Sequence, residues 1–375
     1  MINSRRKFIF QLGTCFAGLA TTPAILKKAL ANLPEPIEPY IREARYYKKL
    51  DNKKVQCLLC PKQCVVSNNK RGYCEVRENQ NGIYKTLVYG RLCTIHQDPI
   101  EKKPLFHFLP GLTALSVATA GCNVDCKFCQ NWNIAQVRPE EISFRYVSPE
   151  ELVNITKYYK SPTIAYTYNE PTIFTEYICD TASAGREKGI RSVMISNGFI
   201  KREPISDLCN VLDAIKIDFK AFSEKFYREI VSGAMKPVLD TMVFIKERGK
   251  WLEIVNLVIP THNDDKNQIK EMCKWIKQNL GPDVPVHFTR FHPQYLMKNL
   301  PPTPVKTLEM AYNIARDAGI NFAYVGNVPS HPAENTICPS CGKILIERTG
   351  YFIRSNNIIN SKCHFCQTSI PGVWS

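Results

Sequence analysis

The sequence has little that would place it in a membrane or on nucleic acid. Its most apolar early stretch, residues 8–26, contains Gln11, several threonines and glycines, and Pro23. A membrane-spanning helix needs about 20 predominantly apolar residues, so no stable span is predicted. The formal net charge is +15, but the basic residues occur in short scattered runs, without Arg/Gly repeats or an evident basic helix. We therefore expect a solvated basic surface that suits an acidic protein partner, and no nucleic-acid interface.

The composition does not indicate disorder. A hydrophobic share of 44% and a charged share of 22% are typical of a globular protein, and 375 residues suffice for one barrel-sized domain with smaller modules. Cysteine is abundant, with 16 residues, and all but five of them occur at metal-ligand spacing. Thiolate clusters assemble in a reducing environment, so a disulfide framework is the weaker interpretation. The five remaining cysteines are Cys15, Cys93, Cys179, Cys209 and Cys273.

The most specific stretch is Gly121 to Trp132, G-C-N-V-D-C-K-F-C-Q-N-W, which follows the apolar run 112–120. Cys122, Cys126 and Cys129 form a CxxxCxxC triplet within it. Three thiolates at this spacing can each hold one iron of a 4Fe-4S cluster, and no nearby cysteine serves the fourth iron. That iron is free to bind a substrate or cofactor. Zinc sites more often pair two CxxC knuckles, so zinc is the weaker interpretation here.

A second cysteine group precedes the triplet, within an N-terminal module at residues 45–110. Prolines 34, 36 and 39 mark a linker before it. Cys57, Cys60, Cys64 and Cys74 then supply four ligands within a compact, loop-rich segment. Zinc and a second iron-sulfur cluster both satisfy this spacing. Either would stabilise a segment too small to fold on a hydrophobic core alone.

Residues 111–330 alternate between short β-rich runs and longer helical ones. A capping box with proline at the first helical position begins at Ser148, and the helical run 304–318 ends before Gly319. Six strand-helix units with a closing strand predict an α/β fold, a partial (β/α)6 TIM-like barrel. The expected strands are Leu112 to Ala120, Thr163 to Tyr168, Arg191 to Ser196, Ala214 to Phe219, Leu252 to Ile259, Val286 to Phe291 and Asn321 to Gly326.

Polar residues gather where these strands end. The chemistry of such a barrel sits at the carboxyl ends of its strands, so we expect these side chains to converge on one rim. Taken singly, each is better explained as a turn or helix cap. The residues at the strand ends are the cysteine loop, Asn169, Glu170, Asn197, Asp218, Lys220, Asn256, His292 and Asn327.

A third cysteine group lies in the tail, residues 336–375. Two CxxC knuckles enclose 21 residues with strand-like runs at 343–346 and 351–354. This pattern predicts a zinc ribbon, whose role could be structural, protein-docking or nucleic-acid binding. His364 lies inside the second knuckle and is interpreted as a bystander. The four expected ligands are Cys338, Cys341, Cys363 and Cys366.

Several motifs together resemble one family of enzymes. The four-cysteine module, the DPIEKKPLFHF stretch at 98–108, GCNVDCKFCQNW, TYNEP, SNG, IKIDFK, the VGN run and the ribbon are similar to those of radical S-adenosylmethionine (SAM) enzymes of the AmmeMemoRadiSam system. The resemblance covers nearly everything after about residue 45. These enzymes are similar in turn to pyruvate formate-lyase activating enzymes, whose fold is a six-unit partial barrel. The resemblance implies a 4Fe-4S cluster on Cys122, Cys126 and Cys129, with SAM bound to its open iron.

The resemblance also implies residues that contact SAM. Asn169 and Glu170 stand where activating enzymes have a Gly-Gly-Glu motif that touches the methionine amino group, with Tyr168 and Asn169 replacing the two glycines. Asp218 and Lys220 match an Asp-x-Lys pair near SAM. Three further residues match more weakly: Asn197, Asn256 and His292.

The implied reaction is reductive cleavage of SAM to a 5'-deoxyadenosyl radical, which abstracts hydrogen from a substrate that the sequence does not identify. The expected partners are a reductant protein of the flavodoxin or ferredoxin type and Memo-type and AMMECR-type proteins of the same system. Two alternatives stay open. One is a glycyl-radical enzyme activase of the pyruvate formate-lyase activating type, and the other is a metal-binding or nucleic-acid-binding adaptor.

The first 31 residues read as a leader. Ser4-Arg5-Arg6-Lys7-Phe8-Ile9 resembles a twin-arginine motif, and Ala29-Leu30-Ala31 resembles a cleavage site. Twin-arginine export carries folded, cofactor-loaded proteins, whereas SAM and low-potential electrons are supplied in the cytoplasm. The leader thus predicts export while the chemistry predicts a cytoplasmic protein, and a frayed basic N-terminus is the alternative.

Overall fold

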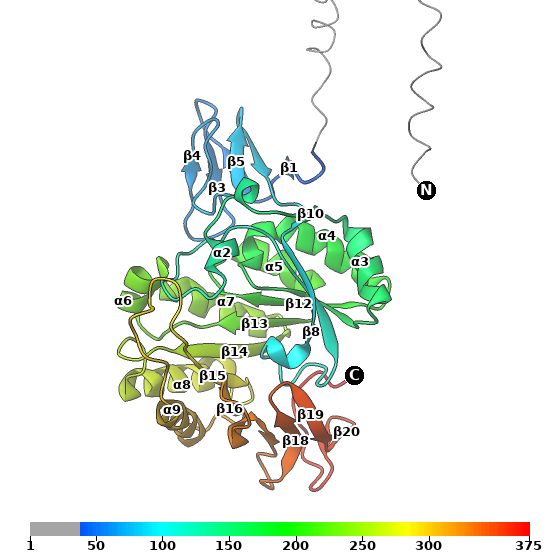
Figure 1. Ribbon diagram of the computed structural model, residues 1–375, viewed down its shortest axis with the longest axis vertical. Coiled ribbons are helices and arrows are strands. Elements are labelled where there is room, and N and C mark those ends of the chain that lie inside the picture. Colours follow the sequence, from blue (N-terminus) through cyan, green and yellow to red (C-terminus); the bar gives the residue numbers. More distant parts are fainter. Residues whose placement is uncertain (1–37) are drawn as a thin grey trace, which may run out of the picture. The chain divides into compact units, whose positions relative to one another are not determined.

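The fold is built on one eight-stranded sheet in the part of the chain that the computed structural model describes, residues 38–375 (Figure 1). The leader at 1–31 lies outside these residues. Seven strands run parallel in chain order, and an eighth, β8, pairs antiparallel with β9 at one edge. The strands, in spatial order, are β16 (Ala323–Gly326), β15 (Val286–Arg290), β14 (Trp251–Val258), β13 (Ala214–Asp218), β12 (Arg191–Ser196), β11 (Thr163–Tyr166), β9 (Thr113–Ala118) and β8 (Thr94–Pro99).

A helix follows each of the first six parallel strands. Helix α3 begins as its sequence predicts, because the Ser148 hydroxyl accepts a 3.2 Å bond from the amide of Glu151 and Pro149 occupies the first turn. Helix α9 ends before Gly319, whose φ of +85° suits glycine. The helices are α3 (Pro149–Tyr158), α4 (Thr175–Arg186), α5 (Arg202–Val211), α7 (Met235–Glu247), α8 (Lys266–Leu280) and α9 (Val305–Asp317).

Shorter helical segments complete the connections between these elements. They are η1 (Ile100–Lys102), α2 (Trp132–Ala135), η2 (Pro139–Glu141), η3 (Pro171–Phe174), α6 (Glu224–Phe226), the π-helical η4 (Tyr227–Val231) and η5 (Pro332–Glu334). Among the described residues, none of the helices combines the length and the apolar character needed to cross a membrane. The predicted alternation of strands and helices is confirmed.

Strand β8 was not expected from the sequence, which assigns residues 45–110 to the N-terminal module. Its residues Thr94–Pro99 pair with β9 from Thr94↔Ala118 to Pro99↔Thr113. The strand shows no apolar alternation in its sequence. It lies at an edge of the sheet, where such a pattern is not required and where Pro99 is tolerated. The chain therefore joins the central sheet before the DPIEKKPLFHF stretch is complete.

The N-terminal module consists of two small antiparallel sheets. One contains β1 (Arg42–Glu43), β6 (Ile83–Thr86) and β5 (Arg77–Gln80), and the other β2 (Tyr47–Lys49), β3 (Val55–Cys57) and β4 (Val65–Val66). A short ladder of β7 (Arg91–Leu92) with β10 (Arg145–Tyr146) follows. The apolar core of the module is small, which fits a segment that needs metal ligation for stability. Its buried members are Ala44, Val55, Cys57, Leu59, Val66 and Tyr84.

The C-terminal tail, like the N-terminal module, forms small sheets of short strands outside the central sheet. These are β17 (Thr336–Ile337), β18 (Ile344–Thr349), β19 (Phe352–Asn356), β20 (Ile358–Ile359) and β21 (Lys362–Cys363). Strands β18 and β19 match the two strand-like runs in the sequence. The tail is anchored to the rest of the fold, because the Arg348 guanidinium donates a 2.9 Å bond to the carbonyl of Phe106 and Val373 forms a bridge with Phe108.

Candidate active site

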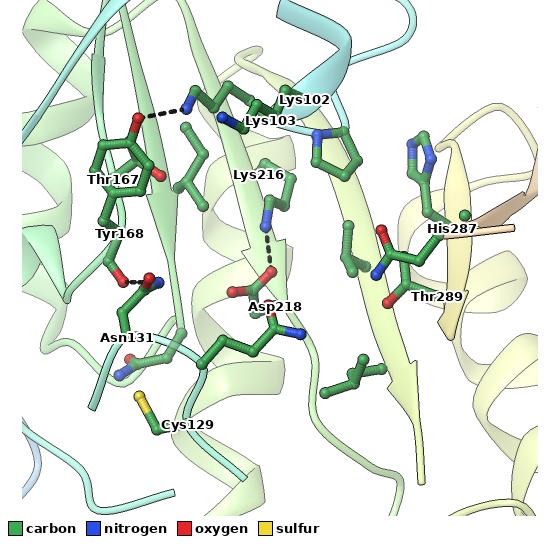
Figure 2. A pocket seen from close by; sticks show the side chains of 18 of the residues that line it. Lys102, Lys103, Cys129, Asn131, Thr167, Tyr168, Lys216, Asp218, His287 and Thr289 are labelled. Carbon is green, nitrogen blue, oxygen red and sulfur yellow. Dashed lines mark hydrogen bonds and ion pairs between the residues drawn. The ribbon is translucent and has the colours of Figure 1, made fainter. Parts of the chain in front are cut away.

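The main cavity of the described residues opens at the carboxyl ends of the parallel strands and measures about 760 Å³. Figure 2 shows side chains from several strands pointing into it. The convergence predicted from the sequence is therefore observed for most of the residues concerned. The predicted residues that line the cavity are Cys122, Cys126, Cys129, Asn169, Glu170, Asn197, Asp218, Lys220, His292 and Asn327.

The cysteine loop follows β9 and is fixed by backbone hydrogen bonds to η4. The amides of Asp125 and Lys127 donate 3.0 Å bonds to the carbonyls of Val231 and Ile230. Gly121, which has a φ of +90°, starts the loop, and a Cβ there would lie 2.7 Å from the carbonyl oxygen of Cys74. Only glycine suits both this conformation and this close approach. The loop is thus bonded to η4 and passes close to the N-terminal module at Gly121.

The three thiols of this loop line one cavity without forming a set as compact as that of the tail. No three thiols of the described residues other than those in the tail lie close enough together to surround one metal ion. Burial raises the pKa of the Cys122 thiol, and the nearby Glu170 carboxylate raises it further. No fourth cysteine lines the cavity. A 4Fe-4S cluster held here would therefore keep one iron without a protein thiolate.

A partly buried ion-pair group faces the thiols from the end of β13. Lys220 Nζ lies 3.3 Å from Asp218 Oδ2, and Lys216 Nζ bonds the other carboxylate oxygen. Burial alone would lower the pKa of Lys220, but Asp218 and then Cys126 outweigh it and raise that pKa. Lys220 therefore stays cationic beside the cysteine loop, where it can hold an anionic group.

Asn169 lines the cavity and has an unsatisfied acceptor. Its amide nitrogen donates to Gly121 O at 2.9 Å and Thr119 Oγ1 at 3.2 Å. Its Oδ1 is buried and has no protein partner. A buried acceptor without a partner is costly, so a ligand ammonium or amide at this point would satisfy it.

Tyr168 keeps a glycine-like backbone although it is not glycine. Its φ is +71°, and Asn131 Nδ2 donates a 2.7 Å bond to its carbonyl (Figure 2). The phenol donates to Asp98 and accepts from Lys103 Nζ at 3.4 Å. Side-chain contacts thus hold the tyrosine in a left-handed backbone conformation that is unusual for a residue other than glycine.

Glu170 is occupied by protein donors. Oε1 accepts bonds from Thr172 N at 3.0 Å, Thr172 Oγ1 at 2.7 Å and Ser196 Oγ at 2.7 Å, while Oε2 accepts one from Asn197 N at 2.8 Å. Its carboxylate therefore ties the end of β11 to the end of β12. A direct contact of Glu170 with SAM stays a prediction, and the structure gives the residue a positioning role.

The three weaker candidates differ in their placement. Asn197 lines the cavity, but its side chain is already bonded within the protein. Its Nδ2 donates to Asn123 Oδ1 and its Oδ1 accepts from Phe199 N, both at 2.8 Å. Asn256 does not line the cavity; its amide donates to the carbonyl of Phe219 at 2.9 Å and so supports the backbone next to Lys220. His292 is exposed and lies at the cavity wall.

Sequence reasoning missed the polar residues in the depth of the cavity. Lys103 comes from the DPIEKKPLFHF stretch, bonds Asp98 at 2.6 Å and has its pKa lowered to about 8 by burial. Lys216 lies mid-strand in β13, between two buried isoleucines. A lysine inside an apolar strand is the signal that could have found it. Both side chains are labelled in Figure 2.

The same stretch closes the far end of the cavity. The amides of Phe106 and His107 donate to the two oxygens of Glu253 at 3.0 and 2.9 Å, and Glu253 also bonds His287 at 2.8 Å. His287 lines the cavity. The DPIEKKPLFHF stretch therefore builds the floor of the site, which the strand pattern alone did not reveal.

The tail cysteines form a compact tetrad. Cys338 Sγ lies 3.6 Å from Cys366 Sγ, Cys341 Sγ lies 3.8 Å from Cys363 Sγ, and all four sulfurs lie within 4.8 Å of one another. Zn–S bonds of about 2.3 Å in a tetrahedron give S···S distances of about 3.8 Å. The tetrad could hold one metal ion. His364 is not among its members, and Tyr351 of the same module reaches the main cavity.

The N-terminal cysteines lie together but less tightly. Cys57, Cys60, Cys64 and Cys74 line one small cavity between the module and the cysteine loop. They do not form a set as compact as the tail tetrad. Of the other cysteines that the structure describes, Cys93 is partly buried and Cys179, Cys209 and Cys273 are buried, away from these sites.

The fold and site define an α/β protein with a three-thiol loop at the end of its first parallel strand. The sequence profile of the radical SAM superfamily matches residues 116–276. An uncharacterized protein of Methanocaldococcus jannaschii is 44% identical over 335 residues, 88% of this chain and 99% of its own. The chain belongs to the radical SAM superfamily.

One more distant curated relative and one solved structure are also similar to the chain. The pyruvate formate-lyase 1-activating enzyme of Escherichia coli is 19% identical over 218 residues, 53% of this chain and 87% of its own. A radical SAM methyltransferase structure from Sphaerobacter thermophilus has a TM-score of 0.47 at 13% identity, covering 87% of this chain and 86% of that one. This protein is thus a radical SAM enzyme related to activating enzymes.

Proposed function

We propose that this enzyme cleaves SAM reductively at a 4Fe-4S cluster on Cys122, Cys126 and Cys129 and directs the resulting radical to hydrogen abstraction. One observation carries the proposal. Three thiols of one loop line a large cavity that no fourth cysteine lines, and a partly buried lysine–aspartate pair faces them. When bound, such a cluster supplies one electron to SAM and yields methionine and a 5'-deoxyadenosyl radical.

The chain's own residues orient SAM. Lys220, held cationic by Asp218, binds the methionine carboxylate, and the unpartnered Oδ1 of Asn169 accepts a hydrogen bond from a nitrogen of SAM. Glu170 holds the ends of β11 and β12 together, and its carboxylate oxygens accept hydrogen bonds from protein donors and not from the ligand. The floor built by the DPIEKKPLFHF stretch excludes water from the depth of the cavity.

The partial barrel, the zinc ribbon and the system partners belong to the same proposal. The parallel strand order supports a partial (β/α)6 barrel, and the sulfur spacing of the tail tetrad supports zinc. The motifs quoted above support membership of the AmmeMemoRadiSam system, with Memo-type and AMMECR-type partners. A reductant of the flavodoxin or ferredoxin type supplies the electron.

A glycyl-radical activase is the second candidate function. The relationship to a pyruvate formate-lyase activating enzyme favours it, and the cavity mouth bordered by exposed His292 and by Tyr351 could admit a protein segment. The two candidates share SAM cleavage and differ in substrate. Electron paramagnetic resonance of a glycyl radical on a co-expressed partner would distinguish them.

Anaerobic reconstitution tests the proposal. With dithionite and SAM, the wild-type enzyme should form 5'-deoxyadenosine and methionine, and Cys126→Ala should form neither. Cys273→Ala, which removes a buried thiol outside the cavity, is the matched control and should keep both products. Full turnover in Cys126→Ala would refute the assignment of the cluster ligands. A metal-binding adaptor would instead contain zinc without iron.

A further inference from the structure

We propose that Cys57, Cys60, Cys64 and Cys74 hold a second, redox-active 4Fe-4S cluster, which passes electrons to the cluster of the SAM site. The sequence left zinc and iron-sulfur open at these four positions. The structure favours the cluster through the spacing of the thiols, through two unpartnered donors, and through the position of the module.

The spacing of the thiols separates the three cysteine groups. In the tail, four sulfurs surround one point at the distances a single zinc requires. The N-terminal four line one cavity but, like the triplet of the SAM site, are not drawn together in this way. Thiolates that bind four different irons of a cubane are necessarily farther apart than thiolates on one ion. The N-terminal group therefore resembles the triplet and not the tail.

Two buried donors without partners line the same cavity. Arg77 is fully buried, its terminal nitrogen bonds Glu176 at 2.6 Å, and its Nε has no acceptor. The hydroxyl of buried Tyr84 also has no acceptor. An unmade hydrogen bond at a buried donor is costly. The inorganic sulfides of a cluster would supply the acceptors, and hydrogen bonds to cluster sulfurs raise the reduction potential.

The backbone around the four thiols is shaped for such a group. The amide of Tyr73 donates to Cys64 Sγ at 3.4 Å. At Gly72, a Cβ would lie 2.5 Å from the Tyr84 hydroxyl and 3.8 Å from Cys64 Sγ, so glycine keeps the donor next to the thiols. Any larger side chain would displace Tyr84 from the cavity.

The module is docked on the loop that carries the SAM-site cysteines. The Cys74 carbonyl oxygen would lie 2.7 Å from a Cβ at Gly121, which directly precedes Cys122, and the Tyr73 phenol donates to Asp125 of the same loop. Asn123 lines the N-terminal cavity, Asn197 lines the main one, and their side chains share a 2.8 Å hydrogen bond. One amide pair thus connects the walls of the two cavities.

The proposed step transfers one electron and no atoms. A reductant protein of the flavodoxin or ferredoxin type gives one electron to the N-terminal cluster, which returns to its oxidised form as it reduces the SAM-site cluster. The presence of the second cluster does not depend on the proposed function. Its role as a relay does rest on it, because the relay needs an acceptor at Cys122, Cys126 and Cys129.

Metal content tests the cluster. Anaerobically purified full-length enzyme should contain about eight irons with matching sulfide and about one zinc. The triple variant with alanine at Cys122, Cys126 and Cys129 should keep about four irons. About two zincs without iron in that variant would overturn the proposal. In wild type, Mössbauer spectra should show that SAM perturbs about one iron in eight, because only one iron of one cluster has an open site; perturbation of about two irons in eight would also overturn the proposal.

Two variants test the role. Tyr84→Phe should lower the potential of the cluster that does not respond to SAM, whereas Tyr47→Phe, whose hydroxyl bonds exposed Glu43 at 2.6 Å, should leave it unchanged. Cys57→Ser with Cys74→Ser should reduce 5'-deoxyadenosine formation at least roughly tenfold with reduced flavodoxin, yet retain it with dithionite. Equal loss with both reductants would refute the relay. Absence of the product from wild type with dithionite would refute the proposed function instead.

Discussion

The ammonium group of Lys220 lies 3.3 Å from one oxygen of Asp218, and Lys216 holds the other oxygen of the same carboxylate. Asp218 is therefore satisfied even without Lys220. If Lys220 is removed, the Asp218 carboxylate is still paired with Lys216. This makes Lys220 a suitable position for separating SAM binding from folding.

Lys220→Ala should keep the iron of the cysteine loop and weaken SAM binding. Loss of a charge-assisted bond to a carboxylate costs about 1.5–3 kcal/mol, which corresponds to about 10- to 150-fold in Kd. Anaerobic calorimetry with SAM and an iron assay measure the two effects. Lys220→Arg keeps the charge and should lose less affinity. Loss of iron from a folded Lys220→Ala protein would show that Lys220 supports the cluster and not SAM.

Asn169 and Glu170 should differ in what their substitution changes. Asn169→Ala removes an unpartnered acceptor of a cavity-lining residue and should raise the Kd for SAM about tenfold. Glu170→Gln places an amide against hydrogen-bond donors and should lower the free energy of unfolding by about 1–3 kcal/mol. Denaturation and SAM titration of both variants measure this. If Glu170→Gln lost SAM binding at unchanged stability, Glu170 would contact SAM directly.

The tail tetrad should be structural and without redox function. Removing Cys363 and Cys366 together should release one zinc and unfold the tail, because zinc binding and folding are coupled in such modules. Uncoupled 5'-deoxyadenosine formation should persist. His364→Ala is the control and should keep the metal, since His364 lies outside the tetrad. Unchanged zinc content in the double variant would contradict the ligand assignment, and loss of the central cluster would place the tail within the active site.

The buried His107 should make the fold sensitive to mild acid. Burial lowers the pKa of His107 from 6.5 to about 4, although Glu253 opposes this. Between these values the unfolded state binds a proton that the folded state does not, so stability falls as the pH falls. The expected loss between pH 7 and pH 5 is about 2 kcal/mol.

Anaerobic urea denaturation at several pH values measures this loss. His107→Gln removes the titrating group and should flatten the pH dependence, whatever its stability at pH 7. His96→Gln removes an exposed histidine and should leave the slope unchanged. An equally steep slope in His107→Gln would assign the acid sensitivity to other groups.

Much of this fold could be predicted because its signals are local. Ser148 and Pro149 start a helix through their own hydroxyl and ring, and the glycine at 319 ends one through its backbone freedom. The β-rich runs between such signals gave seven strands whose observed bounds differ by a few residues at most. The spacing of Cys122, Cys126 and Cys129 likewise specified a thiol site, since the spacing of ligands along a chain is a local property.

Edge pairing could not be predicted, because it depends on what the partner strand offers. Residues Thr94–Pro99 have no apolar alternation and become a strand only because β9 presents an open edge to them. For the same reason the DPIEKKPLFHF stretch did not disclose that it builds the cavity floor. Its contacts are with Glu253, about 150 residues away in the chain.

The sequence by itself determined the strand–helix order, the three cysteine groups and the membership of Asp218 and Lys220 in one site. Only the tertiary structure decided how the individual polar atoms are used. In the structure, protein donors bond both carboxylate oxygens of Glu170, and Oδ1 of Asn169 has no protein partner. Asn256 does not line the cavity and bonds the carbonyl of Phe219. Spacing along a chain fixes which residues can meet, but hydrogen-bond partners are assigned by packing, where each buried donor and acceptor competes for partners from distant segments.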